Sequence, residues 1–592
     1  MAKSKLSNIA LLGSLIVIGI NIIVFIVFGY PEIMNYVDSN KILSSSEKSI
    51  PDQNTTNDHS NENKELNEVI SLENTNNYKS PENNNNDGII LLSLTDGYFK
   101  HIFAYHPQTL PLNKITDGED DDVDPELSPD GNFIAYASNK NGYWDIYKLN
   151  LSNGNEIQLT NTPEYDGSPT WSPDGQWLAY ESYVNYNLEI VLVPTSGDEN
   201  QKIQLTDNQA SDHSPKWSPT SRKIVFVSDR TGDCEIWIAD LDQKDNRFKN
   251  ISNRLSIQDK NPIWSPDGEY IAWSTEYENN RTILLNKIDS EKDPEIIGSG
   301  NRPIFSPSGN LILSEINYPN SNAITIYSVD DKQITLPLTY IHSQSFGLDW
   351  NTEANSHLIY DLINDPTESY IPPKMLIREN NSTDLAIIGR SKLAQLSNIT
   401  APYPFLHNDV YQSFSDLRIY ISEIAGWDFL KSLENAYIPL TESLKPGMEN
   451  NWLLTGRAFA LNSLPLDAGW VKIMKEDING EVYWRVFIKT RYQDGSQGEP
   501  LKDTPWDLTA RYQGDTLSYE NGGKYEQTTA GYWIDFTEIA LRFGWNRKSA
   551  QNNWRTYFPG TRFNIFVQDN NLNWYDALLE IYPEEIILEK NY

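Results

Sequence analysis

A chain of 592 residues with a formal net charge of -35 is too long for a single hydrophobic core and too acidic to favour nucleic acid as a partner. Its 17 Trp and 33 Tyr, with abundant Asn and Asp, favour strands and turns, so we expect a mainly β protein. The single cysteine, Cys234, excludes an intrachain disulfide and any CxxC redox or metal pair.

The first predicted element is a transmembrane helix. Residues Ile9–Phe28 form an apolar run that is about 30 Å long as a helix, which matches the hydrocarbon core of a bilayer. No good cleavage site follows the run, so we interpret residues 9–29 as an uncleaved signal anchor. Lysines precede it and acidic residues follow it, so the positive-inside rule places residues 1–8 in the cytoplasm and the bulk of the chain outside.

Residues 30–87 are predicted to be a disordered linker. This segment is rich in Asn, Ser and Glu and has too few apolar residues to bury a core. We expect it to act as a flexible tether between the membrane and the folded part.

A repeat with steps of 41 to 47 residues follows the linker. That period suits one four-stranded propeller blade. In each copy a strand ends in a large apolar residue, Pro presets the first turn position, Asp suits the next, and Gly accepts the left-handed conformation. The copies are Leu127-Ser128-Pro129-Asp130-Gly131, Trp171-Ser172-Pro173-Asp174-Gly175, Trp217-Ser218-Pro219, Trp264-Ser265-Pro266-Asp267-Gly268, Phe305-Ser306-Pro307-Ser308-Gly309 and a degraded Trp350-Asn351-Thr352.

The full motif D-x-x-P-x-W-S-P-D-G stands at Asp166–Gly175. It resembles the repeats of TolB-like propeller proteins of the WD-type superfamily, and this resemblance implies a β-propeller over residues 88–395. Gly88–Thr116 look like three strands without the turn motif, which complete a seventh blade or clasp the ring, so we expect six or seven blades. The resemblance also implies a protein-binding platform outside the cytoplasm.

Four aspartates each lie three residues before the proline that opens an innermost strand. We expect them to gather around one mouth of the central channel, either as a binding rim or as caps that accept backbone N–H bonds in their own loops. They are Asp122, Asp166, Asp212 and Asp259.

Residues 400–592 are predicted to form a separate α+β domain, because the repeat stops and the pattern changes. We expect helices over 410–424 and 535–543 and a strand over 482–488. The domain is dense in tryptophan, which serves either as core or as a surface that stacks on sugars or peptides.

After its first predicted helix the domain carries, in this order, Gly426-Trp427-Asp428-Phe429, Gly456-Arg457-Ala458-Phe459, Phe543-Gly544-Trp545 and Asn573-Trp574-Tyr575. This order is weakly similar to that of zinc-dependent D-alanyl-D-alanine carboxypeptidases. Those enzymes carry H-x-x-G-x-A-x-D and a later W-H, which supply the metal ligands. The matching positions here are Leu453, Ala460 and Tyr575, and none of them binds zinc in that way. The resemblance therefore implies a non-catalytic relative with a groove, for which Arg457, Trp452 and Tyr575 are candidate residues.

The last histidine of the chain is His407, so we expect no His-based zinc site and no Ser-Asp-His triad in the C-terminal domain. No metal and no cofactor are predicted. A glycosidase-like pair of carboxylates stays open as an alternative, because the domain offers Asp467, Glu476, Asp477, Asp494, Glu499, Asp507 and Asp515.

These observations favour a single-pass, membrane-anchored extracytoplasmic binding protein, not an enzyme, whose propeller engages a protein or a cell-wall component. The alternative is a carboxylate-based hydrolase that acts on cell-wall or extracellular glycan through the C-terminal domain. A third reading is a structural spacer.

The predicted topology can be tested by adding protease to intact cells. We expect the protease to remove the region after Tyr30, because the positive-inside rule places that region outside. Immunoblotting with an antibody against the C-terminal domain measures the loss, and lysed cells are the control. Protection of the domain in intact cells would contradict the orientation.

Overall fold

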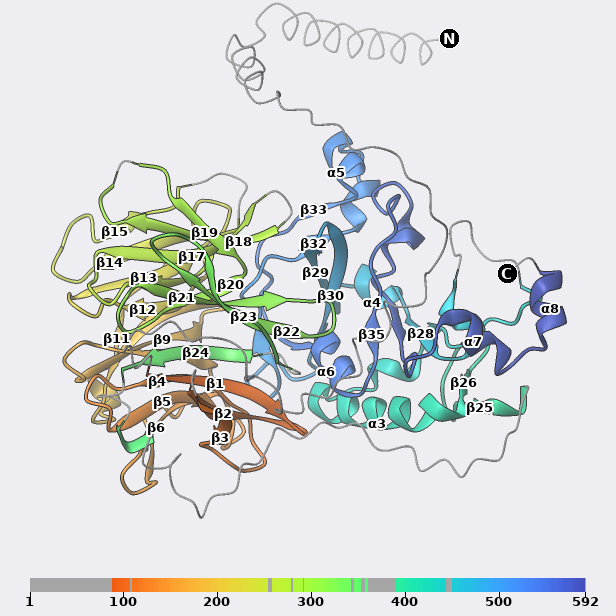
Figure 1. Ribbon diagram of the computed structural model, residues 1–592, viewed down its shortest axis with the longest axis horizontal. Helices are drawn as coiled ribbons and strands as arrows, with labels where there is room; N and C mark the ends of the chain where they lie inside the picture. The colour runs from red at the N-terminus through yellow and green to blue at the C-terminus, as the bar shows by residue number, and fades with distance from the viewer. Residues whose placement is uncertain are drawn as a thin grey trace, which may run out of the picture. The chain divides into compact units, whose positions relative to one another are not determined.

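The computed structural model describes residues 88–106, 109–253, 258–277, 280–290, 292–341, 345–352, 357–359, 390–442 and 450–590 (Figure 1). These residues belong to one compact unit that spans Asn84–Tyr592. Within this part of the chain no helix has the length and apolarity needed to cross a membrane. The predicted anchor (9–29) and linker (30–87) lie outside the described residues.

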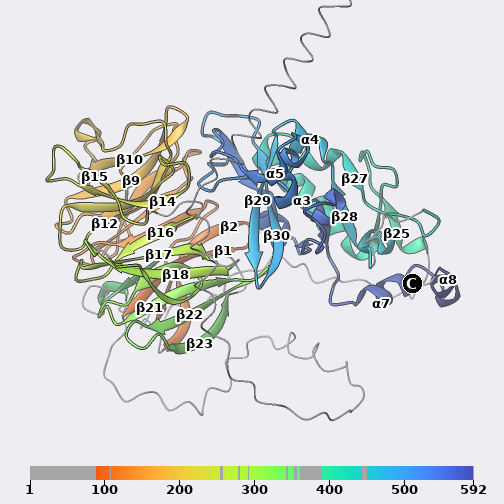
Figure 2. The ribbon, with the colours of Figure 1, turned by 90° about the horizontal axis from the view of Figure 1, so that it is seen from above.

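Six antiparallel four-stranded sheets form the blades of a propeller (Figures 1 and 2). The strands of each blade are given from the innermost to the outermost. The first blade is β24 (Ser345–Asn351), β1 (Ile89–Asp96), β2 (Phe99–His106) and β3 (Thr109–Lys114), and the second is β4 (Asp122–Leu127), β5 (Phe133–Ser138), β6 (Asp145–Asn150) and β7 (Glu156–Gln158). The third is β8 (Asp166–Trp171), β9 (Trp177–Val184), β10 (Asn187–Pro194) and β11 (Ile203–Gln204), and the fourth is β12 (Asp212–Trp217), β13 (Lys223–Ser228), β14 (Glu235–Asp240) and β15 (Phe248–Asn250). The fifth is β16 (Lys260–Trp264), β17 (Tyr270–Tyr277), β18 (Asn280–Lys287) and β19 (Glu295–Ser299), and the sixth is β20 (Asn301–Phe305), β21 (Leu311–Asn317), β22 (Asn322–Ser328) and β23 (Ile334–Ile341).

The ring closes by a clasp between its two ends. Strand β24 follows the sixth blade in sequence but pairs with β1, with Trp350 opposite Ile90 and Leu348 opposite Leu92. The innermost strands β24, β4, β8, β12, β16 and β20 contact one another in this order, and β20 contacts β24. Of the two arrangements expected for Gly88–Thr116, the structure therefore shows the clasp, and the described residues form six blades.

The repeated Ser-Pro-Asp-Gly segments form the predicted turns. In the second blade the N–H of Gly131 donates to the carbonyl of Ser128 at 2.9 Å, and Gly131 has φ 72°. The Ser128 hydroxyl donates to Asp130 Oδ1 at 2.6 Å and accepts from the N–H of Phe133 at 3.0 Å. The polar groups of the turn thus form hydrogen bonds within the turn itself, which explains why Ser and Asp recur with Pro and Gly.

Two of the tryptophans that precede the turns join neighbouring blades. The indole N–H of Trp171 donates to the carbonyl of Glu126 in the preceding innermost strand at 3.0 Å. Trp264 makes the equivalent bond to the carbonyl of Lys216 at 2.9 Å. Both rings are buried, so each contributes apolar area and satisfies its polar atom at once.

The C-terminal domain holds two four-stranded sheets, of order β29-β30-β34-β31 and β27-β28-β36-β35, and two short strand pairs, β25-β26 and β32-β33. The strands are β25 (Leu393–Gln395), β26 (Phe405–His407), β27 (Leu433–Asn435), β28 (Ala458–Leu461), β29 (Val471–Ile478), β30 (Glu481–Lys489), β31 (Glu499–Pro500), β32 (Trp506–Asp507), β33 (Lys524–Tyr525), β34 (Tyr532–Asp535), β35 (Asn546–Arg547) and β36 (Ile565–Val567). The helices are α3 (Asn408–Ala425), α4 (Leu464–Asp467), α5 (Thr516–Asn521), α6 (Phe536–Arg542), α7 (Trp574–Leu579) and α8 (Glu584–Glu589).

These elements agree with the pattern expected from the sequence. The helix predicted over 410–424 is α3, which begins after the cap His407 and ends at Gly426 with φ 73°. The predicted strand is β30 and the second helix is α6. Several of the tryptophans are buried in the main core of the domain, namely Trp484, Trp506, Trp545 and Trp554.

Leu348→Ala tests the clasp. Leu348 in β24 is 7% exposed and packs with residues of β1 and β2, so truncation leaves a cavity at the ring closure. We expect a loss of about 2 to 4 kcal/mol in the free energy of unfolding, measured by urea denaturation. Ile334→Ala in β23 is the control, because Ile334 is 58% exposed and should change stability by less than about 0.5 kcal/mol. Equal effects of the two substitutions would contradict the clasp.

Candidate binding sites at the propeller mouth and in the C-terminal domain

The four aspartates predicted to form a channel rim lie at or next to the start of innermost strands, but all four are buried, at 0 to 5% exposure. Asp166 accepts hydrogen bonds from Ser182 Oγ at 2.6 Å and Thr162 Oγ1 at 3.2 Å, both within or just before its own blade. Asp212 binds the Arg230 guanidinium at 2.8 Å. This placement favours the alternative in which each aspartate secures its own blade.

A different position of the repeat reaches the mouth of the channel. In five innermost strands the residue directly before the proline has φ between 46° and 53°, and a register shift accompanies it. A left-handed backbone before proline is sterically disfavoured, so this bulge is imposed by the fold. The residues are Asp124, Ser168, Ser214, Asn261 and Arg302.

The clasp strand repeats this geometry with glycine. Gly347 in β24 has φ 81°, and a Cβ on it would lie 2.5 Å from Cα of Asp124. The neighbouring innermost strand thus approaches too closely for any side chain. The ring of bulge residues is therefore complete around the mouth.

A segment of the C-terminal domain lies across this mouth. Lys502 forms an ion pair with Glu181, and its Nζ lies 3.2 Å from the Ser168 hydroxyl of the bulge ring. Asp503 pairs with Lys260 at 2.7 Å, and Thr504 donates to Gln258 at 2.9 Å. Burial opposes the charge of Lys502, but the carboxylates of Glu181 and Asp124 outweigh it and raise the pKa of the ammonium group.

Contacts from other parts of the C-terminal domain reach most of the blades. Tyr420 and Arg542 donate to the carbonyl of Tyr98, and Gly531 N–H donates to Tyr183 Oη at 2.6 Å. Strand β29 contacts β18, as Figure 2 shows. Three further hydrogen bonds are Thr528 to Asp229 at 3.1 Å, Tyr525 to Glu276 at 3.3 Å, and Arg547 to the carbonyl of Pro319 at 3.0 Å.

Between the propeller mouth and this domain lies a cavity of about 460 Å³, which we call the mouth cavity. Its walls combine bulge residues of the propeller with charged side chains of both parts. Seven lining residues are cationic: Lys100, Lys260, Arg281, Arg302, Arg485, Lys502 and Arg542. Nine are acidic: Glu119, Asp121, Asp124, Glu315, Glu476, Glu499, Asp503, Asp535 and Glu538.

The acids considered for a glycosidase-like pair serve other purposes. Glu476 lines the mouth cavity, where Arg547 and Arg485 outweigh its burial and hold its pKa at about 2. Glu499 also lines it, 3.9 Å from Lys100. Asp477 forms an ion pair with Lys475. Asp494, Asp507 and Asp515 accept bonds from residues two or three positions on, and Asp467 lies on the exposed α4.

A second hollow, the domain groove, has a volume of about 690 Å³. Leu453 and Ala460, two of the positions that correspond to metal ligands in the resembling carboxypeptidases, line it together. The third position, Tyr575, lies on α7 in another apolar cluster and is not part of the lining. Ile565 of β36, which pairs with Ala460 of β28, takes its place, and Phe563 and Asn564 directly before β36 also line the groove.

The remaining groove candidates do not line the groove either. Trp452 packs against the cluster that includes Leu453, and Lys548 lies 5.2 Å from the centre of its ring. Arg457 is 1% exposed and forms part of an ion-pair network. The residues that do line the groove are Pro402, Tyr403, Glu434, Asn435, Ile438, Glu442, Leu453, Ala460, Ser463, Phe558, Pro559, Thr561, Phe563, Asn564 and Ile565.

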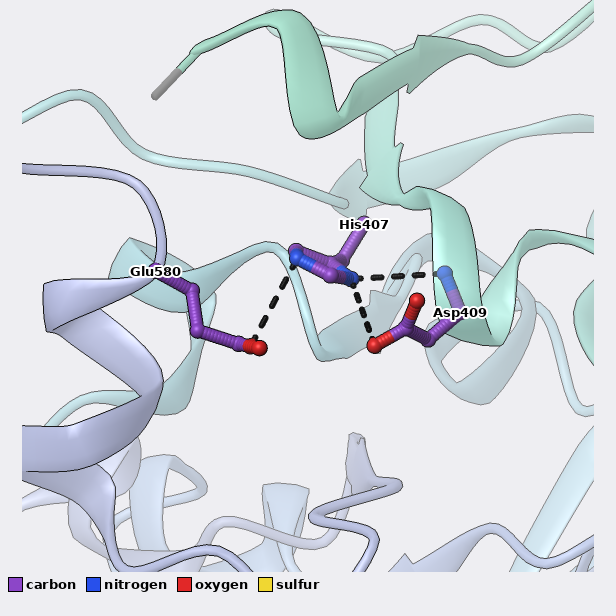
Figure 3. Close-up of side chains that lie close together, drawn as sticks. All are labelled: His407, Asp409 and Glu580. Atoms are coloured by element: carbon purple, nitrogen blue, oxygen red, sulfur yellow. Dashed lines mark hydrogen bonds and ion pairs between the residues drawn. The ribbon is translucent and has the colours of Figure 1, made fainter. Parts of the chain in front are cut away.

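The network around Arg457 includes a histidine that the sequence prediction set aside. Figure 3 shows His407 between Asp409 and Glu580, and one ligand atom of each lies within 4.8 Å of the others. Such a triad has the chemistry of a metal site. The premise that this domain lacks a usable histidine was therefore wrong, because His407 itself belongs to it.

Two cationic side chains of the protein already pair with the carboxylates of the triad. The Arg457 guanidinium binds Glu580 Oε2 at 2.7 Å and also pairs with Asp409, and Lys392 lies 3.2 Å from Glu580 Oε1. His407 Nδ1 accepts from the Asp409 N–H at 3.3 Å, which fixes the neutral ring. Burial and Arg457 lower the pKa of His407 to about 4. The triad thus serves as a charged clasp between α3, β28 and α7.

The sequence signal that could have identified the mouth residues is the variation between repeats. The aspartate three positions before the proline is constant in four copies, whereas the residue directly before it is Asp, Ser, Ser, Asn or Arg. A constant position serves the fold of every blade. A position that varies between blades is not required by the blade fold and can contribute to a binding site.

Asp166→Asn tests the burial of the constant aspartates. Burial raises the pKa of Asp166 from 3.8 to about 7, so the folded protein holds the proton and stability is lost as the pH rises through about 4 to 7. Across this pH window the free energy of unfolding of the neutral variant should rise relative to that of the native protein, by up to about 4 kcal/mol. Urea denaturation at several pH values measures the difference.

Asp212→Asn is the matched control in the next blade. It removes the carboxylate that binds Arg230, so we expect destabilisation by about 2 kcal/mol or more at neutral pH. A loss of stability in Asp166→Asn at pH 8 as large as that in Asp212→Asn would contradict the assignment.

Comparison with known proteins supports the propeller. Residues 115–345 match the family model of the TolB beta propeller domain. No curated protein matches the chain. This part of the chain is therefore a TolB-like propeller, as the repeats predicted.

Three solved structures are similar to parts of the chain. The crystal structure of TolB from Acinetobacter baumannii is 21% identical and covers 44% of this chain and 66% of TolB, with a TM-score of 0.40. A structure assigned as TolB from Agrobacterium tumefaciens is 20% identical and covers 38% of this chain and 94% of its own, with a TM-score of 0.31. An oligogalacturonate lyase from Vibrio parahaemolyticus is 12% identical and covers 42% and 78%, with a TM-score of 0.33.

Proposed function

We propose that the chain is a membrane-anchored extracytoplasmic binding protein that holds a cell-wall component in the domain groove. The TolB-like propeller supports the domain and offers its remaining surface to a protein partner. The groove at Leu453 and Ala460 is the observation that carries this proposal. The anchor and the tether bring the folded part to the outer side of the membrane.

The mouth of the propeller is a poor entrance for a large partner. Lys502, Asp503 and Thr504 bind residues of the third and fifth blades across it, and six further hydrogen bonds tie the domain to the ring. A protein could dock there only by displacing all of these contacts. Of the two hollows described above, the domain groove is therefore the one we assign to a large ligand.

The chemistry of the groove favours holding a ligand over cutting it. Leucine and alanine stand where the resembling peptidases place a histidine and an aspartate, and neither side chain is a metal donor. None of the seven acids considered for a glycosidase pair lines the groove, and the two carboxylates that do, Glu434 and Glu442, accept hydrogen bonds from Asn564 at 2.9 Å and from Tyr403 at 2.6 Å. Aromatic and amide side chains do line it, namely Tyr403, Phe558, Phe563, Asn435 and Asn564, and such groups bind sugars and peptides by stacking and hydrogen bonding.

Ser463→Trp tests the groove. Ser463 lines it and makes no cap bond to α4, so a tryptophan there fills the groove without removing a cap. We expect the full chain in detergent to lose at least about tenfold in affinity for soluble cell-wall fragments, measured by isothermal titration calorimetry.

Leu464→Trp is the matched control, because Leu464 is the next residue, is 67% exposed and does not line the groove. It should bind wall fragments as the native chain does. Failure of the native chain to bind any wall fragment, or equal affinity of the two variants, would refute the proposal.

A further inference from the structure

The mouth cavity contains one cation that its surroundings leave without a carboxylate partner. Six of its seven lining cations lie within 4.0 Å of a carboxylate oxygen: Lys100 with Asp121, Lys260 with Asp503, Arg302 with Glu315, Arg485 with Asp535, Lys502 with Glu181, and Arg542 with Glu538. Arg281 makes no such pair within the part of the chain that the structure describes.

The carboxylates nearest to Arg281 in electrostatic effect have other partners. Arg281 lowers the pKa of Glu476, of Asp503 and of Glu276, its cross-strand neighbour in β17, but other groups lower each of them more. Glu276 accepts a hydrogen bond from Tyr525 at 3.3 Å. Glu476 lies 2.6 Å from Arg547, and Asp503 lies 2.7 Å from Lys260. Arg281 thus acts on these carboxylates at a distance, and its N–H donors form no ion pair with them.

A second donor in the same cavity is also unsatisfied. Trp533 lines the cavity and is 2% exposed, and its indole N–H has no hydrogen-bond partner among the described residues. A buried N–H without an acceptor is costly, so an acceptor atom supplied by a ligand would stabilise this group. Arg281 belongs to β18 of the propeller, whereas Trp533 belongs to β34 of the C-terminal domain.

We propose that the mouth cavity binds a small organic carboxylate, with the Arg281 guanidinium as its anchor and the Trp533 indole N–H as a second donor. A guanidinium matches the planar carboxylate with two parallel hydrogen bonds. The amide of Asn301 lines the same cavity and adds a neutral donor, since its oxygen is the atom that accepts from Asn261. The volume of about 460 Å³ suits a molecule of the size of a short peptide or an acidic sugar.

The nine acidic residues of the lining restrict the ligand. Glu119, Asp121 and Asp124 lie on the first two blades, whereas Arg281 and Arg302 belong to the fifth and sixth. A ligand with several negative charges would meet repulsion across the cavity. The site therefore favours one carboxylate on an otherwise neutral or cationic molecule over phosphate or a polyanion.

This site is separate from the domain groove, so its test does not depend on the proposed function. The probe is N-acetyl-triglycine, which has one carboxylate, and its C-terminal amide is the neutral counterpart. Binding to the full chain in a nonionic detergent is measured by isothermal titration calorimetry at low ionic strength. We expect the acid to bind at least about tenfold more tightly than the amide, because only the acid forms charge-assisted bonds with Arg281.

Arg281→Gln should abolish the preference for the acid. Arg247→Gln is the matched control, because Arg247 is also partly buried but lies in the fourth blade outside the cavity. It should bind the acid as the native chain does. Thermal unfolding without ligand shows whether each variant is folded, and Arg281→Lys should restore part of the preference if Arg281→Gln proves unstable.

Three results would overturn the proposal. They are equal binding of the acid and the amide, absence of binding of both, and a preference for the acid that persists in a folded Arg281→Gln variant. Tighter binding of inorganic phosphate than of the acid would also overturn it, because the acidic lining should exclude a dianion. A failure of the domain groove to bind wall fragments would leave these outcomes unchanged.

Discussion

The bulge before the proline of each innermost strand is the constraint on which the mouth of this propeller depends. It places one residue per blade in a left-handed backbone, with φ near 50° in five strands and glycine in the sixth. The side chains at this position line the mouth cavity or contact Lys502. The strain recurs in every blade because the pairing of the ladder on both sides of the bulge fixes it.

The contact between the propeller and the C-terminal domain is made largely of charged and polar groups. Lys502 with Glu181 and Asp503 with Lys260 are partly or fully removed from water, so the desolvation of the charges offsets much of their attraction. Such pairs add little net affinity, but a wrong alignment would leave a buried charge without its partner. Their effect is to select one orientation of the domain on the ring, and this selection leaves a cavity of fixed shape between them.

Much of the fold could be predicted from the sequence, because a Ser-Pro turn recurs in five copies at a nearly constant period. Pro, with Asp and Gly in most copies, identifies the hairpins, and the large apolar residue before each turn identifies the innermost strand. The closure by β24 was left open, since nothing local in Trp350-Asn351-Thr352 says with which strand it pairs. The role of Asp122 and its counterparts was also open, because a buried cap and an exposed rim need the same residue at the same position.

The sites were harder to predict, because they depend on residues that are far apart in the sequence. Leu453 and Ala460 line one groove, but their third neighbour comes from β36 and not from Tyr575. Strand order decides this, and a motif of two residues cannot reveal strand order. Arg281 has no sequence signal at all, since its position becomes notable only when six other cations of the same cavity are found with carboxylates.

Arginine holds a similar place in two parts of the molecule. At His407, Asp409 and Glu580 the Arg457 guanidinium supplies the positive charge that a metal ion would otherwise bring. Because its geometry is planar and its charge is permanent, it binds two carboxylates at once and joins three elements into a rigid clasp. In the mouth cavity no carboxylate of the described residues forms an ion pair with Arg281, so the same fork of donors is left for a carboxylate that comes from outside. Arginine thus fills the triad at His407 but leaves the mouth cavity able to bind a ligand. The difference lies in the number of carboxylates within ion-pair distance of each guanidinium.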